Sequence, residues 1–323
     1  MDGGPTVPAI LALALAMAAA GVMGFAIQRG ATCMVAAVDA AVNERRFGRS
    51  LALLETAVWV SGLIGAASLL GAGLPTALSY PAGWAVLAGG ALLGIGALVH
   101  GACVFGAVAR LGSGERHYLL TPIGFFGGAL LHRALAMPAL HETGTAPGPG
   151  AVILLLFAPL AIWRLAAFLR AWDRRSDHIW QPHEATIVIG IAFVVLLALA
   201  GPWTYSQILV RLAQGGMGFR LLDAGLFAAL VGGAVIGGRS KRAAAAWTMR
   251  GAFCCLAGGA LMGVGSAMIP GGNDNLILVG LPMAMPYAWQ AIAAMVLAIW
   301  AGLIVQDSWR KKASAPSDRV VSG

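Results

Sequence analysis

The sequence has 323 residues, of which 59% are hydrophobic and only 11% charged, and it contains 45 glycines. Soluble domains carry roughly 25% charged residues, so this composition excludes an ordinary soluble domain. Several apolar runs of about 20 residues predict an all-α polytopic membrane protein. The formal net charge of +8 does not indicate nucleic-acid binding, because the basic residues lie in short loops between the apolar runs.

The expected membrane-spanning segments are nine. The first of them is long for a signal-peptide core and lacks a basic segment before it, so we expect it to be retained. Approximate bounds of the expected spans are 7–27, 52–72, 84–103, 118–138, 151–170, 185–203, 221–238, 251–269 and 287–305. The stretch 205–220 is amphipathic and ends in glycine, which is typical of a segment that lies at the membrane interface or dips into the bilayer.

The distribution of basic residues predicts the orientation. Among the 21 Lys and Arg residues, only Arg133, Arg211 and Arg220 fall outside one set of alternating loops and the C-terminal tail. That set includes the charged loops 170–184 and 239–250. By the positive-inside rule we expect a multi-pass membrane protein with the N-terminus outside and the C-terminus cytoplasmic.

A glycine motif occurs twice. Leu92–Ala97 and Leu261–Ser266 share the pattern Leu-X-Gly-X-Gly-small, and 169 positions separate the two copies. The expected spans that carry the copies cross the membrane in opposite directions, which is typical of the inverted repeats of transporters. Alternatively, small-residue packing motifs recur by chance in glycine-rich membrane proteins.

If the repeat is real, the whole chain forms one integral membrane domain with inverted pseudo-symmetric halves. Each glycine cluster would stop a helix part-way across the membrane, and a short helix would restart near Cys103 and near Asn273, giving broken or re-entrant helices. Unpaired N–H groups at such restarts bind small anions. The expected extents are 1–323 for the domain, about 1–138 and 185–305 for the halves, and 151–170 for the span that links them.

Several stretches resemble the YeeE/YedE, or sulphur transport, family of bacterial inner-membrane proteins, and the resemblance covers most of the chain. The stretches that carry it are Gly24–Cys33, Gly101–Gly106, Arg110–Glu115, Tyr118–Thr121 and Leu261–Gly265. The resemblance implies a helical fold with pseudo-symmetric halves and the uptake of thiosulfate. It also implies that cysteine thiols along a narrow path pass the ion inward through weak S–H hydrogen bonds.

By position, Cys33 and Cys103 match the first two cysteines of that family. The third should fall where this chain has Gly272, followed by Asn273 and Asp274. Either the path uses two thiols with Asn273 as an amide donor, or the substrate differs from thiosulfate. The expected substrate path comprises Cys33, Gly101, Ala102, Cys103, Gly271, Gly272 and Asn273.

Three further residues are candidates of a second rank. His100 precedes the first glycine break. Two interpretations fit it equally, a hydrogen-bonded core histidine and a proton-linked site. Asp274 is expected to cap the restarted helix, although its charge would repel an anion. Cys254 lies beside Cys255, one turn before Gly258. Its thiol is a further candidate, although its position does not follow the 169-residue spacing of the repeat.

The cysteines resemble neither an extracellular disulfide framework nor a zinc site. No phosphate-binding loop or Ser/His/Asp order is evident, so we expect no enzyme, no cofactor and no metal. The leading hypothesis is a transporter of a small inorganic sulfur anion, thiosulfate first, in contact with the lipid bilayer and with a cytoplasmic sulfur-carrier protein as a candidate partner. The alternatives are a membrane thiol-redox or sulfur-transfer protein and a membrane subunit that only scaffolds partners.

Overall fold

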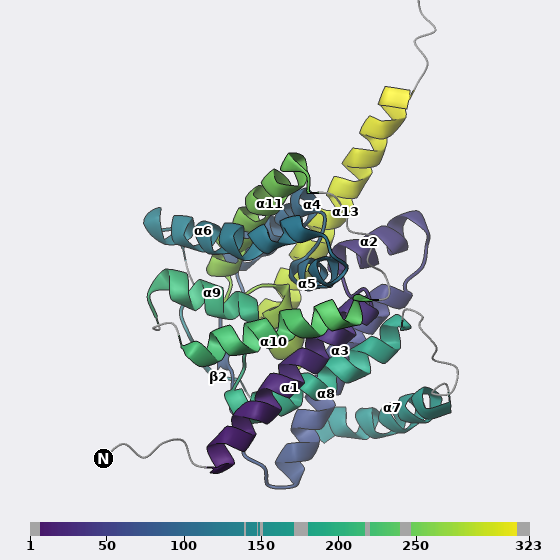
Figure 1. Cartoon of the computed structure of the whole chain (residues 1–323), viewed down its shortest axis with the longest axis vertical. Coiled ribbons are helices and arrows are strands. Elements are labelled where there is room, and N and C mark those ends of the chain that lie inside the picture. The colour runs from purple at the N-terminus through teal and green to yellow at the C-terminus, as the bar shows by residue number, and fades with distance from the viewer. Residues whose placement is uncertain are drawn as a thin grey trace, which may run out of the picture.

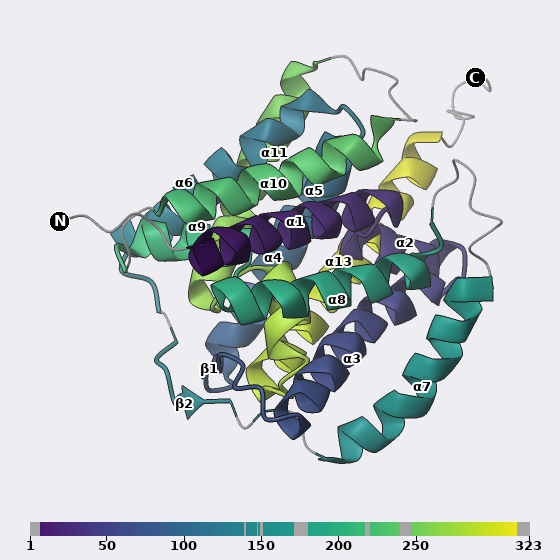
Figure 2. The same cartoon turned by 60° about the horizontal axis from the view of Figure 1, so that its bottom comes forward.

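The computed structural model describes residues 7–138, 140–146, 148, 151–170, 180–216, 220–239 and 247–314. Residues 171–179 and 240–246, in the two charged loops, lie outside the described residues, as does the tail after 314. The regular elements of the described chain are helices, apart from β1 (Leu78–Ser79) and β2 (Gly144–Thr145), which form one antiparallel pair. Figures 1 and 2 show the helices gathered into one bundle.

The helices of the first part of the chain are α1 (Val7–Arg29), α2 (Met34–Asn43), α3 (Gly48–Leu69), α4 (Trp84–His100), α5 (Val104–Gly112), η1 (Arg116–Leu120), α6 (Thr121–Ala134) and α7 (Ala151–Arg170). Those of the second part are α8 (Pro182–Ala200), α9 (Tyr205–Gln214), α10 (Leu221–Gly237), α11 (Met249–Met268), α12 (Asn273–Asn275), the π-helical η4 (Leu276–Gly280) and α13 (Pro286–Ser314).

Six segments of the described chain are long and apolar enough to cross a membrane. They are Pro8–Asn43, Gly48–Leu69, Trp84–Gly112, Pro182–Ala200, Met249–Met268 and Pro286–Trp309. Phe157–Ala167 and Leu221–Gly237 are apolar but shorter. The expected span 118–138 is divided between η1 and the 14-residue α6, which is shorter than the roughly 20 residues that a perpendicular crossing needs. The multi-pass helical fold is therefore confirmed, and the number nine stays a prediction.

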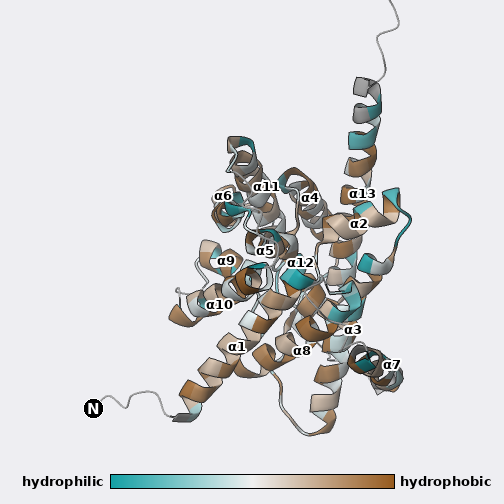
Figure 3. Cartoon of the chain, turned by 45° about the vertical axis from the view of Figure 1, so that its right-hand side comes forward, coloured by the Kyte–Doolittle hydropathy of each residue, from teal (hydrophilic) through white to brown (hydrophobic). Residues whose placement is uncertain are grey.

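The surface of the bundle matches a bilayer rather than water. Large apolar side chains point outward on many helices, for example Leu11, Ile162 and Leu297, each about 60–70% exposed. Figure 3 shows hydrophobic residues along the outer faces of the helices. Soluble proteins rarely expose such continuous apolar surface, so lipid is the solvent that these faces require.

Glycines allow the central helices to touch backbone to backbone. A Cβ atom placed on Gly24 in α1 would collide with the carbonyl group of Leu230 in α10, and one on Gly128 in α6 would collide with that of Ala260 in α11. Lipid supplies no hydrophobic drive for helix association, so close packing of this kind is what holds membrane helices together. The high glycine content is thereby explained by helix contacts.

The packing order of the helices is simple. The helix α1 packs against α10 and α8, and α8 also packs against α3; α4 packs against α11 and α13, and α11 also packs against α6. The helix α7 lies at the edge against α3 (Figure 2). Its Arg164 forms an ion pair with the buried Glu55 of α3, which also contacts His183 of α8. A buried carboxylate needs such partners, so these contacts fasten α7 to the bundle.

Candidate functional site: two helix breaks at the centre of the bundle

The first glycine cluster ends α4 and starts α5, as expected. Gly101 has a φ of +79°, a left-handed conformation that favours glycine, and Cys103 is the residue before the first turn of α5. The His100 side chain stabilises the turn between α4 and α5. Its Nδ1 lies 2.8 Å from the Ala102 carbonyl oxygen, and its Nε2 lies 2.7 Å from the Thr121 hydroxyl. Both ring nitrogens are occupied, so the geometry favours a hydrogen-bonded core histidine over a substrate site.

The second glycine cluster breaks the chain in the same way between α11 and α12. Gly271 has a φ of +91°, and Gly272 precedes the first residue of α12 with φ −81° and ψ −171°. Cys103 has nearly the same backbone conformation, with φ −80° and ψ −177°. The two restarted helices therefore begin with matching geometry at positions that the glycine motif relates.

These two helix starts meet each other. The N–H of Val104, at the start of α5, donates to the side-chain Oδ1 of Asn273, at the start of α12, over 3.1 Å. Asn273 is fully buried, and its Nδ2 has no hydrogen-bond partner within the described chain. A buried amide donor without a partner is costly, so this atom is a candidate donor to a bound ligand.

A pair of thiols lies at the start of α5. We call Cys33 and Cys103 the thiol pair, because Cys33 packs against the core cluster that contains Cys103 and both are free cysteines. The N–H of Met34, at the start of α2, donates to Cys103 Sγ over 3.1 Å. Gly106 in α5 makes the room, since a Cβ there would lie 2.6 Å from Cys33 Sγ. Cys103 is fully buried and Cys33 half-buried.

A second pair lies at the start of α12. We call Ser206, in α9, and Asp274 the serine–aspartate pair. The Ser206 N–H donates to Asp274 Oδ2 over 3.3 Å, and the Ser206 hydroxyl donates to Oδ1. The Ser206 oxygen in turn accepts from the Gly272 N–H over 2.9 Å. The expected cap of α12 is thus corrected: Gly272 is the cap residue, and Asp274 receives the N–H of the neighbouring helix α9.

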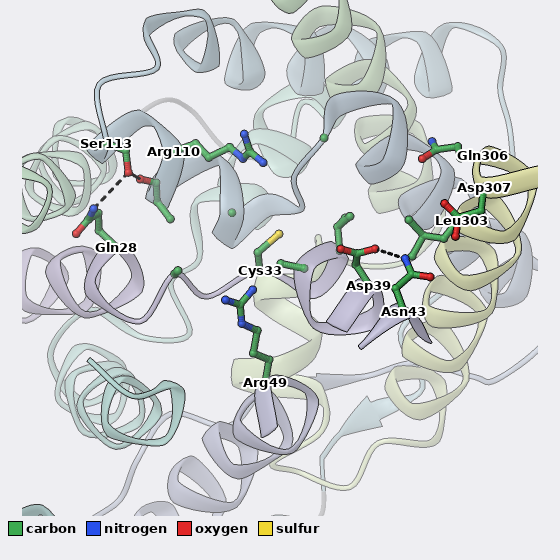
Figure 4. A pocket seen from close by; sticks show the side chains of 16 residues that line it. Gln28, Cys33, Asp39, Asn43, Arg49, Arg110, Ser113, Leu303, Gln306 and Asp307 are labelled. Carbon is green, nitrogen blue, oxygen red and sulfur yellow. Dashed lines mark hydrogen bonds between the residues drawn. The ribbon is translucent and has the colours of Figure 1, made fainter. Parts of the chain in front are cut away.

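Two cavities flank these pairs. The larger, about 390 Å³, is lined by Cys33, by the cations Arg49 and Arg110 and by the carboxylates Asp39 and Asp307. Figure 4 shows Cys33 between the two arginines. The smaller, about 140 Å³, adjoins the other pair; its lining includes Gln207, Arg211, Asn275 and Tyr287.

The cavities lie far apart along α13. Tyr287, near the start of this helix, lines the smaller cavity, and Leu303 lines the larger. At 1.5 Å per residue these two positions are about 24 Å apart along the helix axis. The larger cavity thus has Cys33 in its lining, and the distant smaller cavity is lined by Gln207 and Asn275, the chain neighbours of the serine–aspartate pair.

Most of the site residues that the sequence predicts lie close to the larger cavity or to the thiol pair. Gly101 lines the larger cavity, and Ala102 is fully buried beside it. Cys254 lines neither of the two cavities just described, whereas its neighbour Cys255 is buried against Ala102 and Tyr118, with Cys33 packed on the same cluster. Of the two adjacent thiols outside the repeat frame, the geometry thus places Cys255 nearer the thiol pair.

Sequence reasoning missed Ser206 and the two arginines of the larger cavity. The sequence predicts that the stretch 205–220 lies at the membrane interface or dips into the bilayer. In the structure Ser206 is fully buried, and the Tyr205 hydroxyl donates to the Val104 carbonyl oxygen over 2.9 Å. The available signal was the polar run Ser206-Gln207 at the start of that helix. Within the described residues no group of three His, Cys, Asp or Glu side chains is arranged to hold a metal ion.

The comparison with protein families assigns both helix breaks and both pairs to one family. A family model described as sulphur transport matches residues 29–301, a range that contains both helix breaks, the thiol pair and the serine–aspartate pair. The search of curated proteins finds no match.

Proposed function

Because the chain belongs to the sulphur transport family, we propose that it takes up thiosulfate, or a closely related small sulfur anion, along a path through the thiol pair. The family and the apolar helices identify a multi-pass membrane protein for sulfur transport. The substrate and the path are our proposal, and the observation that carries it is the position of the thiols. Cys33 opens onto a polar cavity and packs against the core cluster that contains the buried Cys103.

The chemistry of the thiol pair suits a soft anion. A thiol is a weak S–H donor, so it interacts with the terminal sulfur of thiosulfate without holding it as firmly as a charged donor would. The free Nδ2 of Asn273 adds a neutral donor on the buried side. Arg49 and Arg110, at the larger cavity, then attract the ion as it leaves the thiols.

An inverted repeat completes the proposal. The packing of α4 against α13 has its counterpart in that of α11 against α6, and the packing of α1 against α10 in that of α8 against α3. The hydrogen bond between Val104 and Asn273 joins residues 169 positions apart, which is the spacing of the glycine motif. These observations support two inverted halves of about 1–138 and 185–305, with the link 151–170, and nine crossings in all.

We further propose that the larger cavity faces the cytoplasm of a bacterium and the smaller one the outside. The larger cavity is lined by Arg49 and Arg110, in loops and helix ends that are rich in basic residues. This orientation has the N-terminus outside and the C-terminus cytoplasmic. A cytoplasmic sulfur-carrier protein would then receive the anion at the Cys33 cavity.

The direct test is the uptake of ³⁵S-labelled thiosulfate by cells that express this chain. Cys103→Ala removes the buried sulfur that accepts the Met34 N–H, and we expect it to lower the initial rate about tenfold or more, the effect of losing roughly 1.4 kcal/mol of favourable contact. Cys254→Ala is the matched control and keeps the wild-type rate. Normal uptake by the Cys103 variant contradicts the thiol path.

The alternative is a thiol-redox or sulfur-transfer protein, and the half-buried Cys33 at an open cavity is the observation that favours it. Reactive cysteines are partly exposed and close to cations. This function predicts a stable sulfur adduct on Cys33 after the purified protein is incubated with thiosulfate, which intact-mass spectrometry detects. A transporter that passes the anion by hydrogen bonds leaves the mass unchanged.

A further inference from the structure

We propose that Asp274 couples the transport of the anion to that of a proton, so that one proton accompanies each anion. This inference rests on the proposed function but concerns its driving force. It begins from an apparent contradiction, since a carboxylate lies in the middle of a path for anions.

The carboxyl group of Asp274 is well held but carries no counter-ion. Its side chain is 2% exposed. It accepts hydrogen bonds from the N–H and the hydroxyl of Ser206 and from the N–H of Asn275. Among the described residues Asp274 takes part in no ion pair. Three neutral donors therefore stabilise a negative charge here, at the N-terminus of α9, whose dipole favours an anion.

The donors that hold Asp274 lie beside the groups that would hold the substrate. Asn273 precedes it in the chain and bonds the start of α5, while Asn275 follows it and lines the smaller cavity. Figure 3 shows α12 as a hydrophilic segment within the bundle. The Nδ2 of Asn273 is fully buried at this place and has no hydrogen-bond partner among the described residues, so it is a donor that a ligand can take.

The space itself is occupied by the serine–aspartate pair. A Cβ on Gly272 would lie 3.0 Å from Asp274 Oδ1 and 3.0 Å from Ser206 Oγ. The carboxylate and the Ser206 hydroxyl thus take the room that a side chain at position 272 would need. In the absence of substrate, the Asp274 carboxylate thus occupies the position that the substrate anion takes at this point of the proposed path.

An ionised Asp274 and a substrate anion cannot occupy this place together. In a medium of low dielectric constant, two like charges a few ångströms apart repel each other by far more than the thermal energy. A proton that enters from the smaller cavity and binds a carboxylate oxygen removes the charge. The anion then passes and takes the released donors, and Asp274 loses its proton to the cytoplasmic side as the anion leaves.

Among the described residues that pack against α12, no other carboxylate can take this role. The helix α12 packs against α5, α9 and η4. From α5 the thiol of Cys103 faces this region and from α9 the hydroxyl of Tyr205, and both are normally protonated at neutral pH. The η4 segment carries no titratable side chain. Arg211 and Tyr80 belong to the smaller cavity, where a fixed positive charge attracts the anion.

The test uses the full chain reconstituted in liposomes with the membrane potential clamped at zero. An acid-outside gradient of one pH unit should raise the steady-state accumulation of labelled thiosulfate about tenfold in the wild type, as expected for one proton per anion. A pH dye inside the vesicles should report acidification when thiosulfate is added. Asp274→Asn should transport without responding to the gradient, and Asp274→Glu should keep the response.

Asp223→Asn is the matched control, because Asp223 is also a buried carboxylate but is paired with Arg220; its response should equal that of the wild type. Wild-type uptake that ignores the gradient and moves no proton overturns the coupling and leaves the transport function intact. A coupled Asp274→Asn protein overturns the assignment to Asp274. If the wild type moves no thiosulfate, both the function and this inference fail.

Discussion

The thiol pair and the serine–aspartate pair solve the same structural problem with different chemistry. In each, the N–H of a residue at the start of a short helix donates to a side chain at the glycine break of the same half. Met34 donates to the sulfur of Cys103, and Ser206 donates to the carboxylate of Asp274. The backbone arrangement is similar, whereas the acceptor is neutral and soft in one case and charged and hard in the other.

This difference shows what a break in a membrane helix must provide. Each restarted helix leaves backbone N–H groups that need a hydrogen-bond acceptor at membrane depth. Any acceptor, neutral or charged, can form these hydrogen bonds. An acceptor that also lets an anion pass must give up its place without leaving a charge behind. A thiol does so directly, and a carboxylate does so only when it is protonated.

The largest expected effect comes from blocking the thiol pair. Cys33 is half-buried and opens onto a cavity of about 390 Å³, so a maleimide added on that side should modify it and reduce thiosulfate uptake to the background of empty vesicles. Cys33→Ala should make the residual uptake insensitive to the reagent. A Cys254→Ala protein that loses sensitivity instead would place the reactive thiol elsewhere.

A smaller effect is expected from crowding the thiol pair with one methyl group. Gly106→Ala places a Cβ 2.6 Å from Cys33 Sγ and must displace that thiol. We expect initial uptake to fall about tenfold, which corresponds to roughly 1.4 kcal/mol in the barrier. Gly127→Ala, where nothing lies within 4 Å of the added atom, is the matched control in an apolar helix. Equal rates in both variants would mean that the position of Cys33 is unimportant.

The smallest effect concerns stability at the serine–aspartate pair. Ser206→Ala removes the acceptor of the Gly272 N–H and one donor to Asp274, leaving buried polar groups unpaired at a cost of about 1–3 kcal/mol. Thermal unfolding in detergent should show a lower midpoint temperature. Ser68→Ala, whose hydroxyl bonds only a carbonyl of its own helix, should shift the midpoint much less. A similar shift in both variants contradicts the structural role of Ser206.

The positions of the helix breaks followed from the sequence. Gly101 and Gly271 both adopt positive φ angles, a local property that glycine permits and other residues resist. The apolar runs likewise indicated a multi-pass helical protein, because hydrophobicity over about 20 residues is a local measure. Proposed site residues such as Cys33, Cys103 and Asn273 were identified because the glycine motif and the family resemblance surround them.

The partners of those residues were decided by tertiary structure alone. Ser206 and Asp274 are 68 positions apart, and Met34 and Cys103 are 69 apart; no periodicity links them, since each contact depends on how several helices pack. The same holds for Asp274. A local rule assigned its carboxylate to its own helix, whereas in the fold the carboxylate also accepts hydrogen bonds from Ser206 in α9. Sequence determines where a membrane helix stops, but only packing determines which group meets the N–H atoms that the stop leaves free.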